Sequence, residues 1–286
     1  MEILEKFKPD YFNNLSLSEK QKTVKELGYF IMDKLRLKHI PITFYLYENE
    51  PVSYLGKLIR HPTFIYIHEI LLTGTSDNYS KSKDMLDNDI FRTYLLVFSV
   101  AHECYHYYQL NLIKKLVHEP ETLTQKEKED AYKFFVSSFS KIFSTLNEKY
   151  HFSSPPCISE KDLYLFSYSE YSANKFASGY TYLLGTHYDD QKNLDLFRSK
   201  HIIPEDTTRR LIEKIYGEKM FAKVSEHNLK LAVDYLKYKK TYNNLKDDYL
   251  GINIDDLENC LNELIKEQKE DLDPTTKLLN ALFKNK

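Results

Sequence analysis

The residue types and spacing best suited to chemistry in this chain fall in one short segment, Val100–His106, which reads V-A-H-E-C-Y-H. On an α-helix, residues four apart lie on the same face one turn along, so the imidazoles of His102 and His106 converge on one point. That convergence suits two corners of a tetrahedral zinc site. Glu103, which stands between them, can reach a metal-bound water and take its proton. We therefore expect two zinc ligands, a general base and Zn2+ as the cofactor.

The chain also contains two incomplete copies of this pattern, which serve as internal controls. The pairs 68–69 and 118–119 are both His-Glu, but neither is followed by a second histidine at the required spacing. The complete copy lies in a strongly apolar helical stretch, where polar side chains without partners would be costly to bury. A metal site therefore explains the segment better than a helix whose polar residues merely face solvent.

A catalytic zinc usually has three protein ligands and a fourth position for water, so a third ligand is expected from another segment. Glu170 is the candidate, on a predicted helix where Ala173 and Ala177 would allow a close approach to the first helix. Asn174, one turn after Glu170, is expected to hydrogen-bond a ligand imidazole and fix its tautomer. Ser167 with Glu170 also matches a capping box, so spacing alone leaves Glu170 either a ligand or a capping residue.

Elements on both sides must position these residues. A helix over 17–38 is expected to begin with a Ser18 and Gln21 capping box. β-Branched and aromatic runs then predict three strands, which we expect to be antiparallel because their connections are too short for crossover helices. The predicted strands are Ile42–Tyr47, Val52–Ile59 and Thr63–Ile67; the predicted helices are 90–118, 124–150, 160–184, and three or four within 205–284.

These elements predict an α+β fold that is predominantly helical, with a small three-stranded sheet and a helical C-terminal extension. A polar stretch near 188–204 indicates a boundary between a catalytic part and a helical C-terminal part. We expect a metallopeptidase domain over 1–187 and a helical C-terminal region over 188–286.

Composition excludes several classes of function. With 40 basic and 42 acidic residues, the chain lacks the cationic field that drives nucleic-acid binding. Three isolated cysteines fit a reducing compartment. Neither an 18-residue apolar run nor a signal-peptide core at residues 1–10 is present, so we expect no membrane association and a cytoplasmic location.

The order of motifs resembles the ImmA/IrrE family of gluzincin metallopeptidases over residues 20–185. The likeness lies in A-H-E-x-x-H at 101–106 and E-x-x-A-N-x-F-A at 170–177. It implies that Glu170 is the third zinc ligand and that the sheet packs on two metal-bearing helices, as in zincins. It also implies a protein substrate, commonly a regulator in a mobile genetic element or a stress response. Two departures are Tyr105, where the family usually has glycine, and the extra helix over 124–150.

The sequence thus predicts an intracellular zinc metalloprotease that hydrolyses peptide bonds in a protein or peptide substrate. The alternative is a catalytically silent peptidase-fold protein that binds or regulates a partner. A purely structural zinc site would need a fourth protein ligand, for which no candidate has suitable spacing. Cys104 is expected to be a packed thiol. Four residues near Glu170 are expected to pack, although one of them could stabilise an oxyanion: Tyr168, Tyr171, Tyr180 and His187.

Overall fold

The computed structural model describes residues 2–45, 55–60, 63–74, 86–138, 168–187, 195, 248–249 and 252–270. The chain divides into two compact units, one of residues 1–111 with 161–212 and the other of residues 112–160 with 213–286. The described part is mostly helical with a small three-stranded mixed sheet, which confirms the broad fold class. The expected domain boundary at 187/188 stays a prediction, because residue 188 lies outside the described residues.

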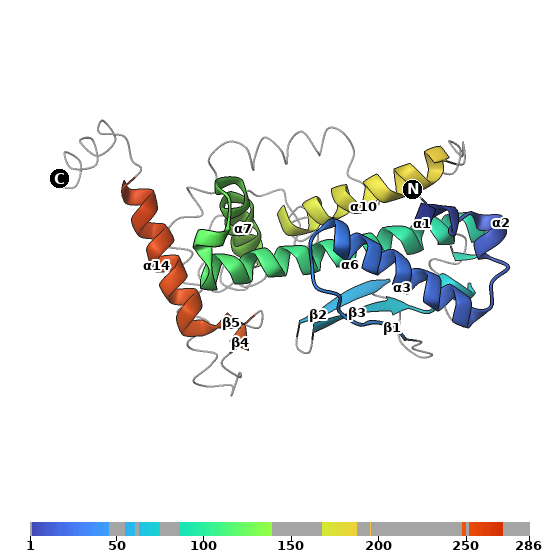
Figure 1. Cartoon of the computed structure of the whole chain (residues 1–286), viewed down its shortest axis with the longest axis horizontal. Helices are drawn as coiled ribbons and strands as arrows, with labels where there is room; N and C mark the ends of the chain where they lie inside the picture. Colours follow the sequence, from blue (N-terminus) through green and yellow to red (C-terminus); the bar gives the residue numbers. More distant parts are fainter. Residues whose placement is uncertain are drawn as a thin grey trace, which may run out of the picture. The chain divides into compact units, whose positions relative to one another are not determined.

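The first unit contains the sheet and the helices that surround it (Figure 1). Its elements are α1 (Glu2–Glu5), α2 (Pro9–Phe12), α3 (Leu17–Lys34), β1 (Ile42–Tyr45), β2 (Gly56–Arg60), β3 (Thr63–His68), α4 (Ile70–Thr73), most of α6 (Asp89–His118) and α10 (Tyr168–His187). The short helices α1, α2 and α4 were not expected from the sequence.

The sheet has the strand order β1-β3-β2, with β3 in the middle. β2 and β3 form an antiparallel pair in which Gly56 lies opposite Ile67, whereas β1 and β3 are parallel, with Ile42 opposite Ile65. The expected antiparallel pairing is therefore confirmed for β2 and β3 and was wrong for β1 and β3. Parallel neighbours need a connection of about a dozen residues or more, usually helical. Here the connection from β1 to β3 spans residues 46–62, which is long enough, and it includes β2.

α3 begins at Leu17, as expected, but its capping box lies two residues earlier than predicted. The hydroxyl of Ser16 accepts a hydrogen bond from the backbone N–H of Glu19, and the Glu19 carboxylate accepts one from the Ser16 backbone N–H. This reciprocal pair is a capping box, so the cap is Ser16 with Glu19 and not Ser18 with Gln21. The helix ends at Lys34, and Arg36 follows with a positive φ of 56°.

A single hydrophobic core holds α3, the sheet and α6 together. Its members are almost fully buried and come from the apolar faces that the sequence periodicity indicates. They include Val24, Leu27 and Ile31 of α3, Ile65 and Ile67 of β3, and Tyr94, Val97 and Ala101 of α6. In Figure 1, α6 runs between the sheet and α10, so it can carry side chains toward both.

The long helices agree with the sequence where they are described. α6 spans Asp89–His118, as expected from the apolar periodicity. α10 begins at Tyr168 and ends at His187, three residues beyond the expected end at 184; residues 160–167 of the predicted helix lie outside the described residues.

The second unit contains the end of α6, the 3-10 turn Pro120–Thr122, α7 (Gln125–Ser138), strands β4 (Asp248–Tyr249) and β5 (Ile252–Asn253), and α14 (Ile254–Glu270). Thr124 caps α7 with Glu127, so this helix begins where the sequence predicted it. The antiparallel β4–β5 pair was not expected. The other helices predicted over 205–284, and residues 139–150, fall outside the described part. Within that part, no helix combines the length and apolarity needed to cross a bilayer.

Candidate metal centre

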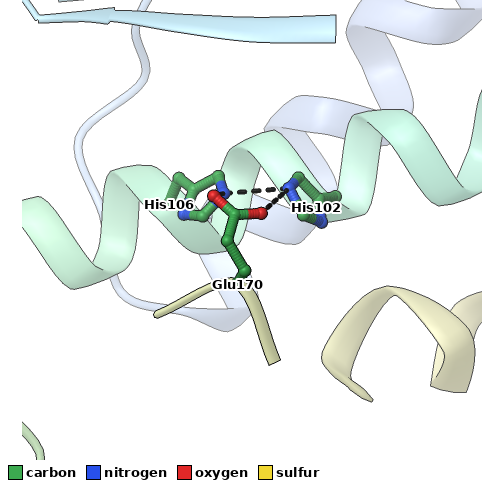
Figure 2. A group of neighbouring side chains, drawn as sticks. All are labelled: His102, His106 and Glu170. Carbon is green, nitrogen blue, oxygen red and sulfur yellow. Dashed lines mark hydrogen bonds and ion pairs between the residues drawn. The ribbon is translucent and has the colours of Figure 1, made fainter. Parts of the chain in front are cut away.

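The two histidines of the central segment point to one place from consecutive turns of α6. Their Nε2 atoms are 2.8 Å apart, and their rings meet nearly perpendicularly with centroids 4.4 Å apart (Figure 2). At 2.8 Å the contact is a hydrogen bond, so one imidazole nitrogen carries a proton and donates it to the other. The i, i+4 spacing thus produces the convergence that helix geometry predicts.

Glu170, in the first turn of α10, completes the cluster from the other side. Its carboxylate oxygens lie 3.4 Å from His102 Nε2 and 3.3 Å from His106 Nε2 (Figure 2). Ala173 and Ala177 are fully buried one and two turns later, which fits the close helix approach expected of small residues. Glu170 therefore faces the histidines, while Ser167, its partner in the capping alternative, lies outside the described residues.

These three side chains have the composition and spacing of a metal site. One ligand atom from each of His102, His106 and Glu170 lies within 4.8 Å of the others. Two imidazoles and a carboxylate form a common donor set for catalytic zinc, whose bonds of about 2.0–2.1 Å give a tetrahedral edge of about 3.3 Å. The two carboxylate-to-imidazole distances match that edge. The residues fit a metal ion, and an ion entering there displaces the proton shared by the imidazoles.

The electrostatics of the cluster show how strongly its members interact. Burial by itself would lower the pKa of His106, but the charge and hydrogen bond of Glu170 outweigh burial and raise that pKa to about 9. Burial would likewise raise the pKa of Glu170, but its interactions with His106 and His102 outweigh it and hold that pKa well below the usual range. Without a metal, the cluster therefore contains a carboxylate and a bound proton at neutral pH.

Glu103 lies on the sheet side of α6. It is 6% exposed, and in the described part of the chain no hydrogen bond satisfies its carboxylate. Gly56 of β2 packs directly against it: a Cβ at Gly56 would stand 3.0 Å from Glu103 Cγ and 3.3 Å from its Oε1. The charge of Glu103 also helps to raise the pKa of His106, so Glu103 lies close enough to the His-His-Glu cluster to interact with it.

The hydrogen bond expected from Asn174 is made by a residue that the sequence analysis missed. Gln109 Oε1 accepts a hydrogen bond from His106 Nδ1 at 2.8 Å. Among the described residues, no hydrogen bond joins the Asn174 side chain to either imidazole. The sequence could have indicated this contact, because residues three apart on a helix are neighbours and Gln109 follows His106 by three.

The remaining candidates pack around the site. Cys104 donates to the backbone carbonyl of Gly28 at 3.7 Å, and burial raises its pKa well above the usual range, which fits the expected packed thiol. Tyr105 stacks on Phe176 of α10 with ring centroids 4.7 Å apart. Tyr180 also packs on Phe176, and burial raises its pKa.

Three further residues were named for packing or oxyanion stabilisation. Tyr171 is buried in α10, Tyr168 opens that helix and His187 ends it. An oxyanion role for any of the tyrosines or for His187 stays a prediction.

The chain has no significant match among protein-family models, curated proteins or solved structures. The functional conclusion therefore rests on the chain's own residues: a partly buried His-His-Glu cluster, able to hold a metal ion, beside the buried Glu103.

Proposed function

We propose that this chain is a zinc-dependent metallopeptidase related in architecture to the ImmA/IrrE gluzincins. The observation that carries the proposal is the convergence of His102, His106 and Glu170 from two helices far apart in sequence. Zinc is proposed over other ions because nitrogen-rich sites with one carboxylate and room for a further ligand suit it. The contact of Gly56 on β2 with Glu103 on α6 supports a zincin-type packing, in which a sheet covers the metal-bearing helix.

The proposed reaction is hydrolysis of a peptide bond. A zinc ion held by the three side chains would activate a water molecule and polarise the scissile carbonyl. Glu103 takes a proton from the attacking water as its oxygen bonds to the carbonyl carbon. It then gives that proton to the amide nitrogen as the carbon–nitrogen bond breaks, so acid and amine products form without any other reactant. The substrate class is a protein or peptide, and the site of action is the cytoplasm.

Metal analysis and a proteolysis assay test the proposal together. Purified protein supplied with zinc is expected to hold about one ion per chain. Incubation with a peptide library, followed by mass spectrometry, is expected to reveal cleavage that a chelator abolishes and added zinc restores.

Glu103→Gln is the decisive variant, because it keeps the size of the side chain and removes the base. It should retain zinc and lose roughly 10²–10⁴-fold in cleavage rate, the usual contribution of a general base. Lys175→Gln serves as a control on the exposed face of α10 and should cleave normally. A chain that binds no zinc contradicts the whole proposal. If the chain binds one zinc ion but cleaves no member of the library, the catalytic proposal is refuted and the alternative of a catalytically silent binding protein stands.

A further inference from the structure

We infer that Gln109 is a positioning residue for the metal centre, one that fixes the tautomer of His106 and ties the Glu170-bearing turn to α6. This inference rests on the proposed metal site and extends it beyond the ligands and the base. Gln109 is 3% exposed and lies one helical turn after His106. Its amide touches both the ligand histidine and the residue immediately before Glu170.

The amide of Gln109 uses its full hydrogen-bonding capacity. Oε1 accepts from His106 Nδ1 at 2.8 Å and from the Ser169 hydroxyl at 2.6 Å. Nε2 donates to the Ser169 backbone carbonyl at 2.9 Å and to the Ser172 hydroxyl at 3.0 Å. A side-chain amide has two acceptor sites and two donors, so all four are satisfied.

These contacts allow one orientation of the amide. A flipped amide would set Oε1 against the Ser169 carbonyl oxygen, and two acceptors cannot bond to each other. The backbone carbonyl of Ser169 therefore holds Nε2 on its own side and leaves Oε1 facing His106. Because Oε1 only accepts, Nδ1 of His106 carries a proton, and in the neutral ring that binds a metal the lone pair is on Nε2, facing the cluster.

The same amide positions the third ligand. Ser169 precedes Glu170 in the chain, and both of its polar groups that contact Gln109 lie at the beginning of α10. Gln109 thus joins α6 to the first turn of α10 within one residue of the carboxylate.

His102 has no corresponding support. Its Nδ1 is buried without a hydrogen-bond partner in the described structure, and its ring stacks on Phe98. Of the two histidines, only His106 is thus oriented through its Nδ1, and the geometry of the cluster depends on this one amide.

Zinc affinity, measured by competition with a chromophoric chelator, tests the role of Gln109 without relying on activity. Gln109→Met keeps the length of the side chain and removes every polar contact, and it should weaken zinc binding about 10–100-fold. Thr181→Val is the matched control: it removes a buried hydrogen bond to the Ala177 carbonyl on α10, away from the cluster, and should bind zinc like the wild type. Folding of each variant is checked by circular dichroism.

Nuclear magnetic resonance of the zinc-loaded protein separates positioning from a general structural role. The His106 Nδ1–H should exchange slowly with solvent in the wild type and fast in Gln109→Met. Gln109→Glu still accepts from Nδ1–H and should keep the slow exchange, although it cannot donate to Ser169. Ser169→Ala, which leaves Gln109 in place but removes one hydrogen bond to Oε1, should weaken zinc binding several-fold and tests the idea if Gln109→Met does not fold.

The outcomes distinguish this inference from the proposed function. If the wild type binds zinc and a folded Gln109→Met binds it equally well, the role of Gln109 is overturned. If only Ser169→Ala folds, equal zinc binding by that variant overturns it instead. Either result leaves the metallopeptidase proposal intact. Failure of the wild type to bind zinc overturns both.

Discussion

Metal binding to this cluster should depend steeply on pH, because the ion must replace a proton. Glu170 raises the pKa of His106 to about 9, so the metal-free site holds a proton throughout the neutral range. Below the pKa of His106, apparent zinc affinity should fall about tenfold for each unit of pH, since one proton is released for each ion bound. With a pKa of about 9, the apparent Kd rises about 90-fold from pH 8 to pH 6.

This effect acts at higher pH than in a site built from free carboxylates, which bind competing protons only in acid. A raised pKa in the metal-free state means that protons compete with zinc, so affinity grows as pH rises and levels off above about pH 9. A histidine with an ordinary pKa of about 6.5 would compete only below that pH, and affinity would be nearly flat from pH 7 to pH 9.

Calorimetry in two buffers of different ionisation enthalpy measures the effect directly. At pH 7.5, about one proton should be released for each zinc ion bound. Glu170→Gln is the informative comparison, because it removes the charge that raises the pKa of His106. In this variant the metal-free histidine should titrate at lower pH and fewer protons should be released. Proton release near zero in the wild type at pH 7.5, or an affinity that is flat between pH 7 and pH 9, would refute the coupling inferred from the His106–Glu170 contact.

Two further predictions concern packing and capping. Gly56→Ala places a Cβ 3.0 Å from Glu103 Cγ, so it should lower the rate of peptide cleavage about 10–100-fold while zinc content stays unchanged. The control is Gly179→Ala, where a Cβ would meet nothing within 4 Å and cleavage should be unchanged. Equal activity of the two variants contradicts the role of the Gly56–Glu103 contact. Ser16→Ala should lower the free energy of unfolding, measured by urea denaturation, by about 1 kcal/mol, because it removes the cap of α3. Ser18→Ala should change it by less than about 0.5 kcal/mol. A larger loss for Ser18→Ala than for Ser16→Ala would show that Ser18 is the cap.

The elements that the sequence predicted well are those defined by local periodicity. α6 follows its apolar pattern from Asp89 to His118, and the Thr124–Glu127 capping box begins α7 as expected. The cap of α3 was misplaced by two residues because Ser16 and Ser18 both offer a hydroxyl with a suitable acceptor or donor three residues later. Where two residues could each cap a helix, the conformation of the surrounding backbone decides which of them does.

The sheet was harder to predict, because strand order is a long-range property. β1 and β3 could be recognised from their β-branched and aromatic residues, whereas β2 lies at Gly56–Arg60, overlapping only the end of the strand predicted over Val52–Ile59. The sequence does not show which strands pair. β3 inserts between β1 and β2, and its central position agrees with the complete burial of Ile65 and Ile67.

The sequence by itself determined the pair of histidines and the glutamate between them, because a helix repeats every 3.6 residues and therefore fixes how His102, Glu103 and His106 point relative to one another. Only the tertiary structure decided that Glu170 faces that pair and that Gln109, not Asn174, holds His106. These choices depend on how α10 lies against α6, a contact between residues some sixty positions apart that no local repeat encodes. Helical spacing is a property of the backbone, whereas the partner across the interface is selected by the packing of Ala173, Ala177 and their neighbours in the folded core.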